Sequence, residues 1–177
     1  MSVFTNPSGG SPQNASAYMS ALLELLGDRD PREVLGATAA ALRAATRSVS
    51  LEQLRRPEAP GKWSVIHVVQ HLADSDLVWA WRLRLVIAQD RPPLTPYDQD
   101  RWAERLNYDE ARLDDGLEQF NLLRRLNLQL IDRLSEDERA RVGVHAERGD
   151  ESVDRMMRLY AGHDLLHLRQ IDRIRAA

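Results

Sequence analysis

The chain has 177 residues, 43% of them hydrophobic and 29% charged, which fits one soluble globular domain with a single substantial core. Its net charge of −3 argues against nucleic acid or an anionic membrane surface as the main partner. It contains no cysteine, which excludes disulfides, thiolate metal sites and a cysteine nucleophile. It has no membrane-length apolar run, and because residues 1–14 lack the charged start and apolar run of a signal peptide, none is expected. A cytoplasmic location is the expectation.

The composition changes near the N-terminus. Residues 1–13 are rich in Ser, Gly, Pro and Asn and are expected to form a flexible arm. A single domain is expected over residues 14–177. Its first element is predicted to be a short amphipathic segment at about 15–27.

Four long helices are predicted after this segment. Asp30 caps the first, which continues to about residue 47, and Ser64 caps the second. The third is expected over roughly 110–134 and the fourth over roughly 151–175. In the second helix, apolar residues recur at intervals of seven: Val65, Leu72, Trp79 and Val86.

The connections between these helices are irregular in sequence. Residues 90–108 form a proline-rich crossover that is longer than a bundle hairpin needs, and such long ordered loops are often functional. In this crossover Tyr97, Asp98 and Trp102 either cover a site or anchor the loop. Residues 142–150 are expected to be a plain loop, because no strand pair is evident. The pattern therefore predicts an all-α, antiparallel four-helix bundle with additional short helices.

Two histidines stand one helical turn apart on the fourth predicted helix. His163 and His167 lie on its apolar arc, where a desolvated imidazole needs a hydrogen bond or a metal. The spacing of four residues lets two imidazole nitrogens converge on one ion. A metal site and a hydrogen-bonded core pair are both consistent with this pattern.

A third ligand has to come from another helix, and the second predicted helix carries a histidine pair of the same spacing, His67 and His71. Relative to Leu72, His71 lies about 100° away and His67 about 140° away around the helix. This geometry selects His71 as the third ligand and places His67 at the rim. His145 lies in a polar loop and is expected to be exposed.

Three segments, KWSVIHVVQHLADSD, RPPLTPYDQDRWAERL and YAGHDLLHLRQI, together resemble the DinB/YfiT-like superfamily of bacterial metal-binding bundles. The resemblance covers about residues 30–177. It implies a four-helix bundle of the DinB/YfiT type, and it places the metal-binding histidines of the family on His71, His163 and His167. It further implies an enzyme that is a metal-dependent hydrolase or an S-transferase using a thiol such as bacillithiol or mycothiol. Homodimers are common among such relatives.

Three neutral histidines leave coordination positions open, which is typical of a catalytic metal site. The open position suits a water for hydrolysis or a small thiol, and this thiol would be a cosubstrate because the chain has no cysteine. Zinc or nickel is the favoured divalent ion, although imidazole also suits other metals. A non-enzymatic bundle that holds a metal or small ligand is the alternative, and a purely structural bundle is a third possibility.

Other polar residues near the histidines have candidate roles. Asp164 directly follows His163, where HExxH sites have a glutamate base, and otherwise it is a solvated residue or the partner of an arginine. Gln170 lies three residues after His167 and could orient its imidazole through a hydrogen bond. Asp74, three residues after the predicted ligand of the second helix, could do the same or pair with a surface arginine.

Overall fold

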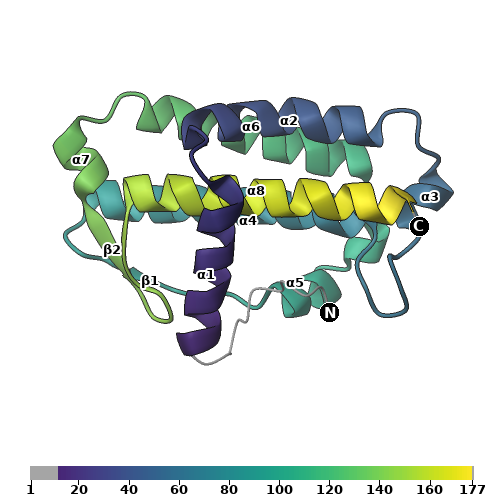
Figure 1. Ribbon diagram of the computed structural model, residues 1–177, viewed down its shortest axis with the longest axis horizontal. Helices are drawn as coiled ribbons and strands as arrows, with labels where there is room; N and C mark the ends of the chain where they lie inside the picture. The colour runs from purple at the N-terminus through teal and green to yellow at the C-terminus, as the bar shows by residue number, and fades with distance from the viewer. Residues whose placement is uncertain (1–11, 177) are drawn as a thin grey trace.

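The structure is a computed structural model and describes residues 12–176. Of the arm predicted at residues 1–13, the described range includes only Pro12 and Gln13, which belong to a helix, and the rest lies outside it. No helix in this range is long and apolar enough to cross a membrane. The predicted all-α four-helix bundle is confirmed (Figure 1).

The bundle is formed by α2 (Pro31–Thr46), α4 (Val65–Ala88), α6 (Leu113–Ile131) and α8 (Val153–Ala176). Helices α2 and α4 each pack against both α6 and α8. Figure 1 shows that α2 and α8 run in one direction along the bundle, whereas α4 and α6 run in the opposite direction. Shorter helical elements surround it: α1 (Pro12–Leu26), α3 (Leu51–Arg55), α5 (Gln99–Arg105), η1 (Tyr108–Glu110) and α7 (Glu136–Ala140).

Side-chain caps fix where the long helices begin. Asp30 accepts a hydrogen bond from the backbone N–H of Arg32, and Ser64 accepts one from the backbone N–H of His67, as the sequence predicts. Helix α6 begins later than the predicted residue 110, because its cap residue Arg112 has extended backbone angles (φ −94, ψ 126), and it ends at Ile131 rather than at about 134. The predicted helix starts are therefore correct where a capping side chain marks them.

The connections contain a small sheet, so the expectation of a plain loop at residues 142–150 was wrong. Strand β2 (Val142–His145) pairs antiparallel with β3 (Gly149–Ser152), and β1 (Pro93–Leu94) pairs parallel with β2. Two strands of four residues show too little alternation to be recognised in sequence. The sheet packs tightly on the bundle, since a Cβ at Gly143 would lie 2.8 Å from Val86 and Leu94.

The crossover has a topological reason for its length. Because α4 and α6 run in the same direction, residues 89–112 must return the chain along the bundle before α6 can begin (Figure 1). Asp98 caps α5 by accepting hydrogen bonds from the N–H groups of Asp100 and Arg101, which anchors the crossover. The ring of Trp102 packs against that of Tyr97, with 4.7 Å between centroids.

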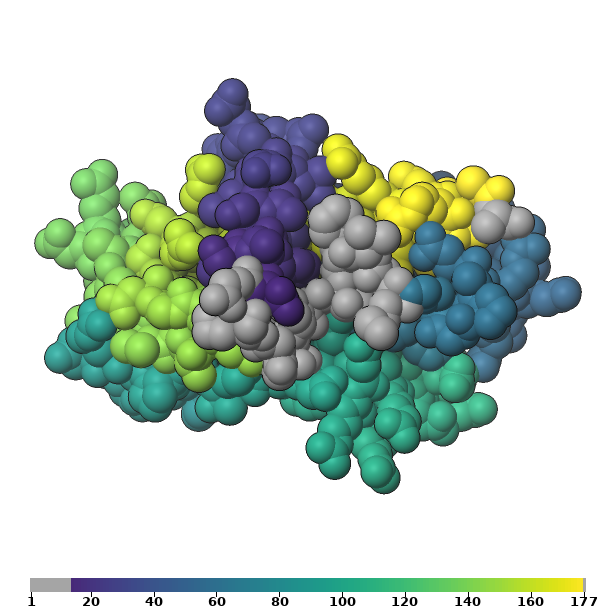
Figure 2. All heavy atoms as spheres, turned by 60° about the horizontal axis from the view of Figure 1, so that its bottom comes forward, coloured from purple at the N-terminus to yellow at the C-terminus, as the bar shows by residue number. Residues whose placement is uncertain are grey.

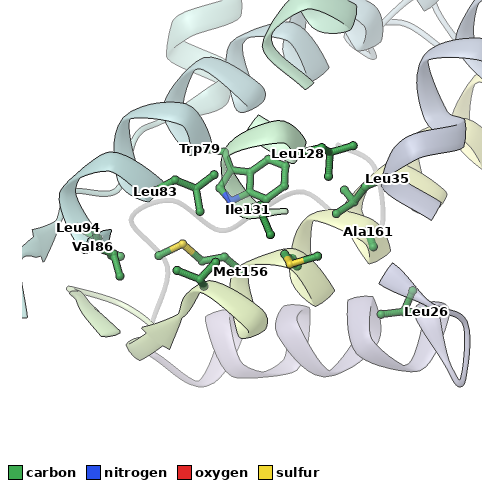
Figure 3. Close-up of a cluster of buried hydrophobic side chains, with 12 residues drawn as sticks. Leu26, Leu35, Trp79, Leu83, Val86, Leu94, Leu128, Ile131, Met156 and Ala161 are labelled. Carbon is green, nitrogen blue, oxygen red and sulfur yellow. The ribbon is translucent and has the colours of Figure 1, made fainter. Parts of the chain in front are cut away.

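The core of the bundle contains two large apolar clusters with a polar layer between them, and a third, smaller cluster joins α1 to α8 around Leu22 and Leu159. One large cluster surrounds Trp79 and Met156 (Figure 3), and the other surrounds Leu72 and Phe120. The four residues predicted at intervals of seven on α4 are all buried, with at most 1% exposure. Between the clusters, the long helices contribute buried polar residues: Thr38, Asp76, Arg124, Asp164 and His167. This polar layer contains the candidate site.

Helix α1 crosses α8 at a glycine. A Cβ on Gly162 would lie 2.2 Å from the backbone oxygen of Leu22, so only glycine permits this approach. Figure 1 shows α1 crossing α8 steeply rather than joining the bundle. The crossing brings Tyr18 and Leu22 close to His163, which directly follows the glycine.

Candidate metal centre

The structure brings His71, His163 and His167 together at the interface of α4 and α8. One ring nitrogen from each lies within 4.8 Å of the others. The Nε2 atom of His163 is 3.1 Å from Nε2 of His71 and 3.1 Å from Nε2 of His167. His71 and His167 are buried, whereas His163 is half-buried and is the most accessible of the three. These are the three residues selected from sequence.

The environment keeps the imidazoles neutral. Burial lowers the pKa of His167 to about 4, and this effect outweighs the hydrogen bond that His167 donates to Gln170, which raises the pKa. Burial, together with the neighbouring histidines, also lowers the pKa values of His71 and His163 well below the usual 6.5. All three imidazoles are therefore neutral at pH 7, which is the form that binds metal.

Gln170 fixes the tautomer of His167. Its Oε1 atom is 2.8 Å from Nδ1 of His167 and can only accept, so Nδ1 carries the proton. A neutral imidazole has one N–H, which leaves Nε2 of His167 as a lone pair directed at the cluster. Among the described residues, Nδ1 of His71 and Nδ1 of His163 have no hydrogen-bond partner.

Hydrogen bonds among the histidines satisfy the cluster poorly. The Nε2 atom of His163 has close neighbours on both sides, but a single N–H cannot make two good hydrogen bonds. If Nε2 of His71 carries the hydrogen and donates it to Nε2 of His163, the Nε2 lone pairs of His163 and His167 face each other. A divalent cation among the three nitrogens would satisfy all the lone pairs at once. The arrangement of donors therefore fits a metal ion better than the hydrogen-bonded core pair.

Asp74 does not orient His71. Its carboxylate accepts hydrogen bonds from the hydroxyl of Tyr108 and from the amide groups of Gln70 and Gln119. Three residues along a helix correspond to a rotation of about 300°, which here turns Asp74 toward η1 and α6 while His71 faces α8. The side chain is buried in a polar cluster of its own.

Asp164 is turned away from the histidines. It is fully buried, accepts hydrogen bonds from Arg124, and accepts another from the hydroxyl of Thr38 at 2.7 Å. Of the roles that the sequence left open for Asp164, the structure shows the pairing with an arginine, and it contradicts a solvated position. Because both carboxylate oxygens are engaged, the geometry does not support Asp164 as a general base.

The other two histidines lie outside the cluster. His67 is at the rim, where its Nδ1 is 2.8 Å from the hydroxyl of Ser64 and its side chain is 17% exposed. His145 was expected to be exposed, but only 3% of it is accessible. The reason is the hairpin, which places His145 against Arg82 of α4.

Sequence reasoning did not single out two groups that adjoin the cluster. The hydroxyl of Ser75 is 3.5 Å from Nε2 of His71 and 2.8 Å from the hydroxyl of Tyr97. The ring of Trp63 lies beside His71 and His167, at centroid distances of 4.9 and 6.4 Å. The position of Ser75, four residues after His71 on the same helix, indicates that it adjoins the cluster. No nearby sequence feature gives the same indication for Trp63.

The metal-free protein is expected to lose stability as the pH falls from about 6.5 toward 4. The unfolded chain binds a proton on His167 at a higher pH than the folded protein does, so acidification favours unfolding. The loss is about 1.4 kcal/mol per pH unit for one such histidine. Burial raises the pKa of Asp76 to about 7, so the folded protein binds a proton on Asp76 at a higher pH than the unfolded chain does. Protonation of Asp76 therefore increases stability on acidification and opposes the effect of His167.

Denaturant unfolding of wild type and His167→Gln at several pH values separates these effects. The contribution of Asp76 is common to both proteins and cancels in the difference, so the variant should lose less stability on acidification. Equal losses in the two proteins would show that His167 is not buried in its neutral form.

Comparisons with known proteins agree with the geometry. Residues 35–171 match the family model described as the DinB superfamily. A protein of Oceanobacillus iheyensis named "Putative metal-dependent hydrolase" is 33% identical over 68% of this chain and 69% of its own. A Bacillus cereus protein with the same name is 28% identical over 76% of this chain and 77% of its own.

A solved structure shares the fold. YfiT from Bacillus subtilis, described as a probable metal-dependent hydrolase with an unusual four-helix bundle topology, matches with a TM-score of 0.74 and 26% identity. The match covers 81% of this chain and 84% of YfiT. With the family model matching most of its length, this chain belongs to the DinB superfamily.

Proposed function

We propose that His71, His163 and His167 hold a divalent metal ion, with zinc or nickel favoured, and that the protein is a metal-dependent enzyme acting on a small electrophile. The observation that supports this most strongly is the convergence of three neutral imidazoles whose close contacts hydrogen bonds cannot satisfy. When bound, such an ion supplies Lewis acidity, which favours the deprotonated form of a water or thiol and polarises an electrophile.

The residues around the histidines have supporting roles in this proposal. Gln170 holds the imidazole of His167 in one orientation and tautomer. The ring of Trp63 packs beside His71 and His167 and helps to hold the two imidazoles in place. Since His163 and Ser75 line a pocket, we infer that the substrate reaches the site from that side.

Hydrolysis and thiol transfer remain the two candidate reactions. The names of the relatives favour hydrolysis. In favour of thiol transfer, no carboxylate among the described residues is hydrogen-bonded to the three histidines, and Asp164 is held by Arg124. A thiol is more acidic than water and therefore depends less on a general base. A thiol would have to enter as a cosubstrate, because the chain has no cysteine.

Thermal unfolding followed by an activity assay tests the proposal. Zinc or nickel should raise the melting temperature of metal-free protein, because a ligand that binds only the folded state stabilises it. The metal-loaded protein should then cleave p-nitrophenyl acetate, and a rate that requires an added small thiol would favour transfer. Stabilisation without turnover across several esters and thiols would favour the non-enzymatic binding module, and an unchanged melting temperature would favour a purely structural bundle.

A further inference from the structure

A small pocket lies beside His163 on the side away from Trp63. Helices α1, α4 and α8, the crossover and the hairpin contribute to its wall, and in Figure 2 α1 lies beside the green segment that contains the hairpin. Its volume is about 40 Å³, which is room for a group the size of a carboxylate or a few waters. The polar residues that line it, besides His163, are Tyr18, Ser75, Arg82, Tyr97, His145, Glu147, Arg148 and Tyr160.

Arg82 points into this pocket without a counter-ion. It is 4% exposed, and no carboxylate of the described residues forms an ion pair with it. The other arginine buried to this degree, Arg124, is paired with two aspartates, and Arg148 at the same pocket is paired with Glu151. Burying a guanidinium without a counter-ion costs free energy, and packing does not offset this cost. The charge of Arg82 therefore indicates that an anionic ligand binds beside it.

The hydrogen bonds that Arg82 makes leave donors unused. One of its Nη atoms donates to the backbone oxygen of Thr95 at 2.7 Å, whereas its Nε has no partner among the described residues. The same Nη lies 3.3 Å from Nε2 of His145. Whether that second contact is a hydrogen bond depends on the tautomer of His145.

The backbone determines this tautomer. The N–H of Glu147 donates to Nδ1 of His145 at 3.2 Å, so Nδ1 is the lone pair and Nε2 carries the hydrogen. Burial, with the charges of Arg148 and Arg82, lowers the pKa of His145 to about 3, so the ring stays neutral. Its Nε2–H cannot accept from Arg82, and two donors therefore face each other in the pocket.

We propose that this pocket binds the carboxylate of a small anionic substrate, with Arg82 as its counter-ion and Nε2–H of His145 as a second donor. A carboxylate accepts hydrogen bonds from both groups and matches the planar guanidinium. This inference rests on the proposed function and specifies its substrate class: the carboxylate end binds at Arg82, and the reactive end of the molecule lies toward His163.

The positions on α4 fit a substrate whose carboxylate lies in the pocket at Arg82 and whose other end reaches toward the histidines. Ser75 and Arg82 follow His71 by four and eleven residues, which places all three within about 40° on one face of the helix. Eleven residues correspond to about 16 Å along the axis, and the Arg82 side chain leans back toward His71, as helical side chains do. The carboxylate and the reactive carbon should thus be several bonds apart.

Calorimetric titration of metal-free protein with glutarate tests the proposal, with the uncharged diamide glutaramide as the matched ligand. Wild type should bind glutarate more tightly than glutaramide, and Arg82→Gln should weaken glutarate binding about 10- to 100-fold. Arg84→Gln removes the same charge from an exposed position on the same helix and should bind glutarate as wild type does. Equal affinity of wild type for the two ligands, or unchanged binding by Arg82→Gln, overturns the proposal.

A measurement on the wild-type protein keeps the test independent of how Arg82→Gln folds. In an NMR titration with glutarate, the Nε–H resonance of Arg82 should shift and that of Arg84 should not. A shift at Arg84 alone, or at neither residue, contradicts the assignment.

These titrations use metal-free protein, so their outcome is separate from that of the metal test. If glutarate binds through Arg82 but zinc and nickel do not stabilise the protein, the proposed function fails and the carboxylate site stands. If the metals bind and support turnover but glutarate does not bind, the proposed function stands and the substrate class is wrong.

Discussion

Replacing His163 by alanine is expected to abolish metal retention and turnover together. The Nε2 atom of His163 is the one that lies 3.1 Å from both of its partners, so its loss leaves two imidazoles without the nitrogen between them. Changes in groups that only support metal ligands cost about 10- to 100-fold in affinity, and the loss of a ligand should exceed this. Elemental analysis of the purified variant and its rate with p-nitrophenyl acetate measure both effects.

His67→Ala is the matched control for this experiment. His67 is a histidine on α4 at the rim, it bonds to Ser64, and it is not part of the three-histidine cluster. This variant should retain metal at the wild-type level. Unaltered metal content in His163→Ala, or equal loss in both variants, would show that the site is assigned to the wrong residues.

Replacing Arg124 by methionine is expected to destabilise the protein by roughly 3–5 kcal/mol, because it leaves buried carboxylates without their counter-ion. Arg124 bonds to both Asp76 and Asp164 and to the backbone oxygen of Leu35, and its guanidinium lies 4.5 Å from the centre of the Phe120 ring. Methionine fills similar volume, so the loss should come from the charge rather than from a cavity. Urea unfolding measures the difference.

The pH dependence of the Arg124 variant provides a second readout. Burial raises the pKa of Asp76 to about 7 even with Arg124 in place, and removing the cation should raise it further. A carboxylate whose folded pKa is raised loses stability as the pH rises above its unfolded value, so the variant should be worse at pH 8 than at pH 5 relative to wild type.

Arg125→Met is the control on the same helix, since the side chain of Arg125 is exposed. It should change the unfolding free energy by less than about 0.5 kcal/mol. A comparable loss in Arg124→Met and Arg125→Met would show that the buried ion pairs do not support the bundle.

Local sequence signals were sufficient for the long helices and for the choice of histidines. Ser64 caps α4, and Leu72 marks its apolar face, so the helical rotation alone separates His71 from His67. The spacing of His163 and His167 likewise depends only on helix geometry. These features could be predicted because each is determined within one helix.

Contacts between distant segments could not be predicted in this way. His145 is buried because the β2–β3 hairpin, which also pairs with β1, places it against Arg82 of α4. No local sequence pattern indicates two strands of four residues. Asp76, Arg124 and Asp164 meet from three different helices, and each alone resembles a surface charge. The buried charges of this protein are therefore a property of its topology.

X-ray absorption spectroscopy of the zinc-loaded protein shows whether the three histidines hold the metal. We expect one zinc per chain with three imidazole nitrogens at about 2.0–2.1 Å and no sulfur. His71→Ala and His167→Ala should each lose this signal, because both residues contribute a nitrogen to the cluster. A spectrum with fewer than three imidazoles in the wild-type protein, or one unchanged by either substitution, would contradict this assignment.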